Sequence, residues 1–273
     1  AICIGTWPYM HCDITLASLE AGKHVLTEAR MAMNLDEAKR MKAAAEATNL
    51  VTMIVPAPMY FESEPTLLRM LKADVFGDLL EIQVSVLGGD YDPDAPLTWR
   101  EQRSLSGNNI MSMGIVNETV RRYAGHERTV YAHGKMFITE RVDPESGTTT
   151  AIDVPDSLGI IAEHESGAVA VYHFSNVANG GRQRTFEFHG TKGGFRLEDG
   201  KAWLIGERGI LEELHIEPEH VYSWRVEQEF INAIRDGTPV TRTSFADGIK
   251  YMEFTEAVHI SMREGRRIDL PLP

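Results

Sequence analysis

The fold is decided by the stretch AICIGTWPYMHCDITLASLEAGKHVLTEAR, residues 1–30. An apolar run at 1–4 ends in Gly-Thr-x-Pro, a helix-like segment follows at 13–20, and a second short apolar run covers 24–27. Gly22 can take the left-handed conformation that ends helices. Strand, helix and strand in this order are typical of a parallel sheet. The stretch therefore predicts a βαβ unit that continues a sheet begun by earlier strands.

The same alternation continues to residue 55. Asn34 with Glu37 three residues later has the form of a capping box, and the segment 35–48 is rich in strong helix formers. The run VTMIV at 51–55 is apolar and rich in β-branched residues, as expected of a parallel strand covered on both faces. These segments predict a second helix and a third strand.

The pattern changes at residue 56. Two prolines within 56–58 can continue neither a helix nor a central strand, so we place a domain boundary between 1–57 and 58–273. After residue 125 the apolar period falls toward two, and ESG, GTKGG and EDG mark turns of the hairpin type. We therefore expect an antiparallel sheet, with a strand at 79–87 and helices at 65–72, 110–125, 224–235 and 245–263.

The composition bounds the partners. The chain of 273 residues has 43% hydrophobic and 25% charged residues, as globular proteins do. A net charge of −13 argues against nucleic acid and anionic membrane surfaces, which require clustered Lys and Arg. We expect a small-molecule partner, no nucleic acid, no membrane and a cytoplasmic location. The two cysteines, Cys3 and Cys12, are interpreted as packing thiols in a reducing compartment.

Motifs for several other chemistries are absent from the sequence. It contains no H-E-x-x-H, C-x-x-C, G-x-S-x-G or Walker loop, so we expect no metal site, thiol redox chemistry, serine hydrolysis or use of nucleoside triphosphates. His215 and His220 flank IEPE in a charged stretch, which we interpret as solvated surface.

A family likeness runs through the chain. TWPYMH at 6–11 and LEAGKHVLTEAR at 19–30 resemble the signature of the Gfo/Idh/MocA oxidoreductases. The likeness continues in the family's order through TWR, SGNNIMSMGIVNE, FHGTKGGFRLE, EQEFINAIRDG and SFADGIKYMEFTEAVHISMREGRRIDL. It implies an α/β plus α+β fold. Residues 1–57 would be the C-terminal part of a Rossmann parallel sheet, and 58–273 a substrate and oligomerisation domain with a large open, mainly antiparallel sheet.

The resemblance also implies an activity. Family members move hydride between NAD or NADP and a sugar, cyclitol or related polyol, and the open sheet often forms dimers or tetramers. The Gly-rich fingerprint that holds the pyrophosphate in such domains is absent, since the chain has no G-x-G-x-x-G. We expect a fragment of a longer protein rather than a natural product without that half, because the latter would expose an apolar edge strand.

The family's catalytic Lys has no counterpart. Its Glu-Lys-Pro motif corresponds to Glu28, Ala29 and Arg30, so Ala29 stands at the Lys position. A guanidinium stays protonated and cannot exchange a proton, so Arg30 does not replace the Lys. Arg30 is either a substrate anchor or a salt-bridging residue at a strand end.

The family's Asp and His are also replaced. Alignment on Gly114 puts Ser112 at the Asp position and Val116 at the His position, on one helix face with Thr119. A slip by one position would put Met113 and Asn117 there, and neither register restores a base.

The remaining candidates are ranked by type. Ser112, Asn117 and Glu118 are the catalytic candidates, although a salt bridge with Arg121 or Arg122 also explains Glu118. Trp99 and Arg100 match the family's Trp-Arg and suit polyol binding by stacking and fixed donors; a packing Trp with a solvated Arg is the alternative. The resemblance implies a cofactor-binding set, with His11 also able to cap its own helix: Thr6, Trp7, Pro8, His11, Glu28 and Arg30.

Three hypotheses follow from these residues. The first is an NAD(P)-dependent oxidoreductase of sugars or polyols that has lost part of its catalytic set. The second is a non-catalytic binding or assembly subunit that pairs through the open sheet. The third is a lyase or isomerase in which Glu118, Arg100 or His11 transfers the proton.

Overall fold

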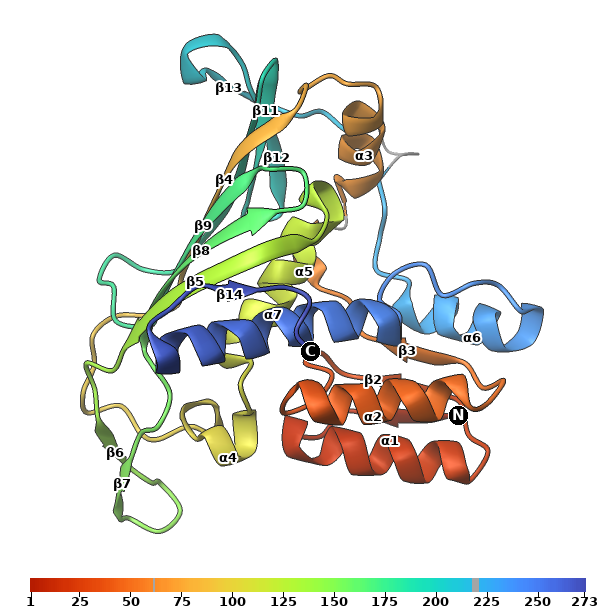
Figure 1. The fold of residues 1–273 in the computed structure, drawn as a ribbon, viewed down its shortest axis with the longest axis vertical. Coiled ribbons are helices and arrows are strands. Elements are labelled where there is room, and N and C mark those ends of the chain that lie inside the picture. Colours follow the sequence, from red (N-terminus) through yellow and green to blue (C-terminus); the bar gives the residue numbers. More distant parts are fainter. Residues whose placement is uncertain (61, 218–220) are drawn as a thin grey trace.

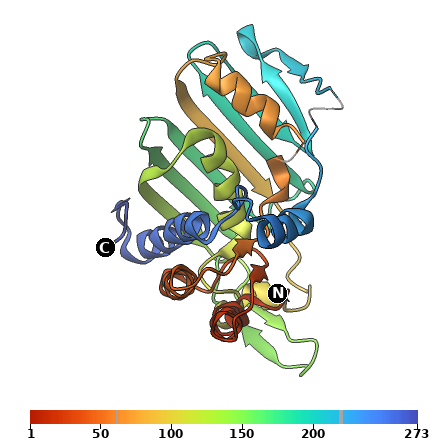
Figure 2. The same ribbon diagram turned by 90° about the vertical axis from the view of Figure 1, so that its right-hand side faces the viewer.

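The first part of the chain builds a small parallel sheet. The computed structural model describes residues 1–60, 62–217 and 221–273. Strands β1 (Ile2–Ile4), β2 (Val25–Thr27) and β3 (Thr52–Ile54) pair in parallel in that order. The connecting helices are α1 (His11–Glu20) and α2 (Leu35–Glu46), which pack side by side (Figures 1 and 2). The predicted strands and helices are thus confirmed.

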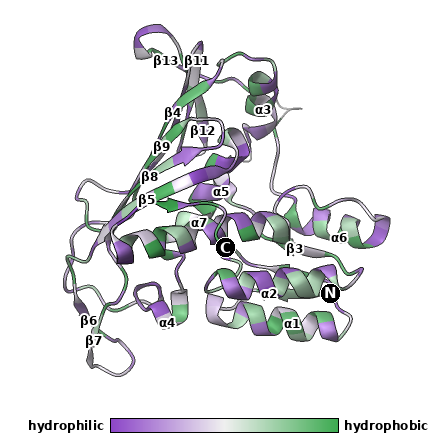
Figure 3. Ribbon diagram, viewed as in Figure 1, coloured by the Kyte–Doolittle hydropathy of each residue, from purple (hydrophilic) through white to green (hydrophobic). Residues whose placement is uncertain are grey.

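Local sequence explains these elements. The Asn34 side chain accepts a hydrogen bond from the Glu37 backbone N–H at 2.9 Å, which caps α2. The reciprocal half of the predicted capping box differs, because the Glu37 carboxylate accepts from the Met33 N–H at 3.0 Å. Polar and apolar segments alternate along α2 in Figure 3, as expected of a helix with one buried face. The interpretation of Cys3 as a packing thiol is wrong. Cys3 is exposed because β1 forms an edge of the sheet, where only Ile4 of this strand is buried. Cys12 is buried as expected.

The second part builds a sheet of nine strands. Their order is β13-β12-β11-β10-β4-β9-β8-β5-β14, and all pairs are antiparallel except β4 with β9. The predicted, mainly antiparallel sheet is confirmed, but the parallel pair was not foreseen. The strands are β4 (Leu79–Leu87), β5 (Glu127–Lys135), β8 (Ser157–His164), β9 (Val169–Ser175), β10 (Gln183–Gly190), β11 (Gly193–Glu198), β12 (Lys201–Ile205), β13 (Leu211–Glu213) and β14 (Ile268–Asp269).

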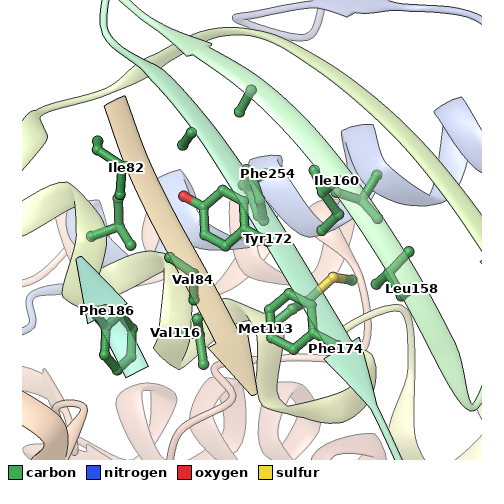
Figure 4. Close-up of a cluster of buried hydrophobic side chains, with 14 of the residues drawn as sticks. Ile82, Val84, Met113, Val116, Leu158, Ile160, Tyr172, Phe174, Phe186 and Phe254 are labelled. Carbon is green, nitrogen blue, oxygen red and sulfur yellow. The ribbon is translucent and has the colours of Figure 1, made fainter. Parts of the chain in front are cut away.

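Helices cover one face of this sheet (Figures 1 and 2). Met113 and Val116 of α5 (Met113–Ala124) lie among side chains of β4, β8 and β9 (Figure 4). Phe254 of α7 (Phe245–Glu264) joins the same core, whereas Tyr251 packs beside Met31 in the core of the first part. Helix α7 therefore connects both parts. The remaining elements are α3 (Glu64–Lys72), α4 (Arg103–Ser106), α6 (Val226–Asp236), and a hairpin of β6 (Glu140–Val142) and β7 (Thr149–Ala151).

The start of α5 differs from the sequence prediction. The helix begins at Met113 instead of Ile110, because Met111 and Ser112 have φ angles of 46° and 61°. Left-handed backbone in residues other than glycine is strained and interrupts a helix.

Two further observations concern the surface. His215 is exposed as predicted, and His220 lies outside the described residues. Across the described ranges of the chain, no helix combines the length and apolarity needed to cross a bilayer.

Candidate functional site

A pocket of about 420 Å³ lies where β1 and β2 end. Residues 5–8 follow β1 and residues 28–30 follow β2, and both segments line it. The opposite wall comes from η3 (Trp99–Glu101) and the first turn of α5. Ligands of open α/β sheets bind outside the carboxyl ends of the strands, which makes this strand-end pocket the candidate site.

The strand-end pocket collects most of the predicted site residues. The predicted substrate residues Trp99 and Arg100 line it, and so do Ala29 and Ser112. The whole predicted cofactor-binding set also lines it: Thr6, Trp7, Pro8, His11, Glu28 and Arg30. Sequence reasoning missed Gly5, Asn109 and Ile115, which also line it. The Asn-Asn pair before the predicted helix could have pointed to Asn109, because Asn favours helix starts.

Aromatic rings and guanidinium groups meet in this pocket. The rings of Trp7 and Trp99 are stacked with centroids 5.9 Å apart. The guanidinium carbon of Arg100 lies 4.3 Å from the Trp99 ring centroid and that of Arg30 lies 5.6 Å from it. Trp99 is thus neither a core residue nor a solvated one, and it brings two cations to one surface.

Arg30 is buried without an acidic partner. Only 7% of the residue is exposed, and its Nη1 donates to the Ser106 carbonyl at 3.2 Å. Burial, with a smaller effect from the charge of Arg100, lowers its pKa to about 10, so it stays protonated at neutral pH. Within residues 1–60, 62–217 and 221–273, no carboxylate forms an ion pair with Arg30 or Arg100.

His11 ties the two strand ends together. Its ring is buried, with Nδ1 2.7 Å from the Arg30 carbonyl and Nε2 2.9 Å from the Thr6 carbonyl. Both partners are acceptors, so each ring nitrogen that carries a proton donates it to backbone. The geometry gives His11 a structural contact with both segments of the pocket.

The start of α5 places only one of the two aligned family positions in the pocket. Ser112 lines it, but Val116 and Thr119 are buried in the core. Val116 and Thr119 thus do not line this pocket, and Ser112 and Ile115 are the residues of this turn that do. Asn109 supports this turn, since its Oδ1 accepts from the Gly114 N–H at 2.8 Å.

The structure separates Asn117 and Glu118 from the strand-end pocket. Asn117 is fully buried and donates to Glu127. Glu118 accepts from the Thr243 hydroxyl at 2.6 Å and borders a different hollow with Arg121 and Arg122. Their catalytic roles stay predictions without support from this placement.

Unsatisfied polar atoms gather around the pocket. The Oγ1 of Thr6 and the Nδ2 of Asn109 are buried and lack a hydrogen-bond partner in the described parts of the chain. Buried polar groups are nearly always bonded, so such atoms beside a cavity fit a polar ligand. A second hollow of about 290 Å³ shares Arg100 and Ser112 with the pocket and extends toward β4.

Comparisons with known proteins identify the family of both parts of the chain. Residues 1–55 match the family model for the NAD-binding Rossmann fold of an oxidoreductase family, and 66–196 match the model for the GFO/IDH/MocA C-terminal domain. A levoglucosan dehydrogenase of Pseudarthrobacter phenanthrenivorans is 25% identical over 98% of this chain and 79% of its own length.

Two solved structures illustrate the range of proteins with this fold. Levoglucosan dehydrogenase in complex with NADH and L-sorbose has a TM-score of 0.85 at 24% identity. A super-repressor mutant of Gal80p from Saccharomyces cerevisiae has a TM-score of 0.80 at 17% identity. Each covers 98% of this chain and is itself covered to 79%.

Proposed function

This chain belongs to the Gfo/Idh/MocA family of oxidoreductases, and we propose that it transfers hydride between NAD or NADP and a sugar or related polyol. The observation that carries the proposal is the strand-end pocket, which joins the segments after β1 and β2 to an aromatic and cationic wall. The NADH and sugar in the similar dehydrogenase structure support it.

The pocket residues fit the nicotinamide end of a dinucleotide. Thr6 Oγ1 has unfilled hydrogen-bonding capacity among the described residues, which a hydroxyl or amide group of a nicotinamide riboside would satisfy. Residues 6–8 and Glu28 would hold it. When bound, the cofactor accepts or donates the hydride.

The chain's own residues bind and orient the substrate. Trp7, which is 46% exposed, offers apolar surface to a sugar ring, and Arg100, held over Trp99, offers fixed donors to its oxygens. Ala29 has no proton to exchange, and Ser112 can only hydrogen-bond the reacting oxygen. In oxidation, the hydroxyl proton would go to water or to Glu28, whose carboxylate lines the pocket.

A non-catalytic binding subunit is the second candidate. The loss of ionisable groups at Ala29 and Val116 favours it, and a Gal80p repressor shares the fold. The lyase or isomerase hypothesis has less support, because Glu118 lies outside the pocket and both nitrogens of His11 face backbone carbonyls.

The open face of the nine-stranded sheet supports a homo-oligomer. Tyr131, Ile161, Val169 and Val171 are exposed there, although apolar side chains rarely gather on a monomer surface. We expect Val171→Glu to lower the mass measured by light scattering, whereas the same change at exposed Val142 of β6 leaves it unchanged.

Cofactor binding tests the oxidoreductase proposal. NADH added to the protein as its source produces it should quench tryptophan emission by energy transfer from the stacked Trp7 and Trp99. Trp7→Phe and Trp99→Phe should each reduce this transfer, while Trp203→Phe in β12 should retain it. Absence of NADH and NADPH binding would leave the binding-subunit hypothesis in its place.

A further inference from the structure

We propose that the substrate of the strand-end pocket is an anionic sugar, and that Arg30 and Arg100 hold its carboxylate or phosphate group. This inference rests on the proposed function, because it names the substrate class of the same site.

Arg30 is buried, and most of its donors are unused among the described residues. A guanidinium has five N–H donors, and one of them is used, by the Ser106 carbonyl, among the residues described. A buried charge without an opposite charge is costly, and proteins normally pair it or give it a ligand. Because Arg30 borders a cavity, the missing counter-charge has room to bind there.

Arg100 adds a second positive charge to the same pocket. Both guanidinium groups lie over Trp99, and their repulsion contributes to the lowered pKa of Arg30. Glu28 lines the pocket, but it forms no ion pair with either arginine in the described chain. This positive site stands out in a protein whose net charge is −13. An anion between the two arginines would relieve their repulsion.

The wall of the pocket at the start of α5 adds further hydrogen-bond donors. Helix α5 starts at the pocket with no acidic residue in its first turn, so its N-terminus offers partial positive charge. The Nδ2 of Asn109 is also a donor. Hydroxyl groups of a neutral polyol need acceptors as well as donors, whereas a carboxylate or phosphate is satisfied by donors alone.

Calorimetry on the NADH-saturated protein, as its source produces it, tests this inference with three probes: D-glucuronate, a D-glucose phosphate and D-glucose. One anionic probe should bind at least about tenfold more tightly than D-glucose. Its identity distinguishes carboxylate from phosphate. Arg100→Gln, which changes an exposed residue, and Arg30→Gln should each remove this preference. Arg235→Gln makes the same charge change at an exposed position of α6 and should keep the preference.

Three results would overturn the inference. D-glucose could bind as tightly as both anions, the preference could survive Arg100→Gln, or NADH could displace the anion and so assign the arginines to the cofactor. Failure of the proposed function is separate: the protein would then bind no NADH or NADPH, while the preference for the anion, measured without cofactor, would stand.

Discussion

Two groups of arginines lie at opposite ends of α5, and they differ in what neutralises them. At the N-terminal end, Arg30 and Arg100 have no acidic partner among the described residues. At the other end, Arg122 and Arg242 both pair with Glu64, and Arg121 lies 4.0 Å from Glu127. Burial of an arginine is therefore a poor sign of a ligand site. The missing counter-charge is what distinguishes the strand-end pocket.

The largest loss of stability is expected at Glu64, which pairs with both Arg122 and Arg242. Glu64→Gln leaves the buried Arg242 and the partly buried Arg122 without their shared carboxylate, so the free energy of unfolding should fall by about 3–5 kcal/mol in denaturant titrations. Glu163→Gln breaks a more exposed pair with Arg128 and should change it little. Equal losses in the two variants would mean that the Glu64 pairs do not matter for stability.

Glu127, which lies beside Arg121, should make the stability of the protein depend on pH. Burial raises the pKa of Glu127 to about 7 from its ordinary value of 4.5. The folded protein therefore holds a proton that the unfolded chain releases, and stability falls as pH rises from 4.5 through 7. Glu127→Gln removes this loss, so its stability relative to the wild type should rise by about 2–3 kcal/mol from pH 5 to pH 8. Parallel pH profiles of the two proteins would contradict this.

The strand-end pocket could be predicted from the sequence better than the arginine pairs at the other end of α5. Residues 6–8 and 28–30 directly follow apolar runs, and the ends of parallel strands meet at one sheet edge. Their meeting could therefore be expected. The family likeness added Trp99 and Arg100, which no periodicity would bring to the same place.

The other end of α5 could not be predicted. Neighbouring residues on a helix point about 100° apart, so Asn117 and Glu118 enter different surroundings from Ser112. Because Met111 and Ser112 have left-handed backbone, α5 also begins later than the sequence predicted. Glu64 and Arg242 lie far from α5 in sequence, and no local pattern reports such pairs. The parallel pairing of β4 with β9 was hidden for the same reason.

The third prediction compares the two kinds of arginine directly. Arg30→Met removes a buried charge with no acidic partner in the described chain, so the free energy of unfolding should stay equal or rise by up to about 2 kcal/mol. Arg242→Met removes a partner of Glu64 and should lower it. Urea unfolding of both variants measures the difference. A loss at Arg30 as large as that at Arg242 would show that Arg30 stabilises the fold in the same way.

The smallest effect on stability is expected at Asn109, where two substitutions distinguish the support of α5 from the charge in the pocket. Asn109 accepts the Gly114 N–H through Oδ1, so Asn109→Ala should cost about 1 kcal/mol in denaturant titrations, as loss of a helix cap does. Asn109→Asp keeps an acceptor there and places a negative charge near a helix N-terminus, so stability should be retained. The same carboxylate lines the pocket of Arg30 and Arg100 and supplies the counter-charge that they lack. Binding of an anionic sugar should therefore weaken in the Asp variant although its fold is intact. Unchanged anion binding in this variant would show that charge does not select the ligand.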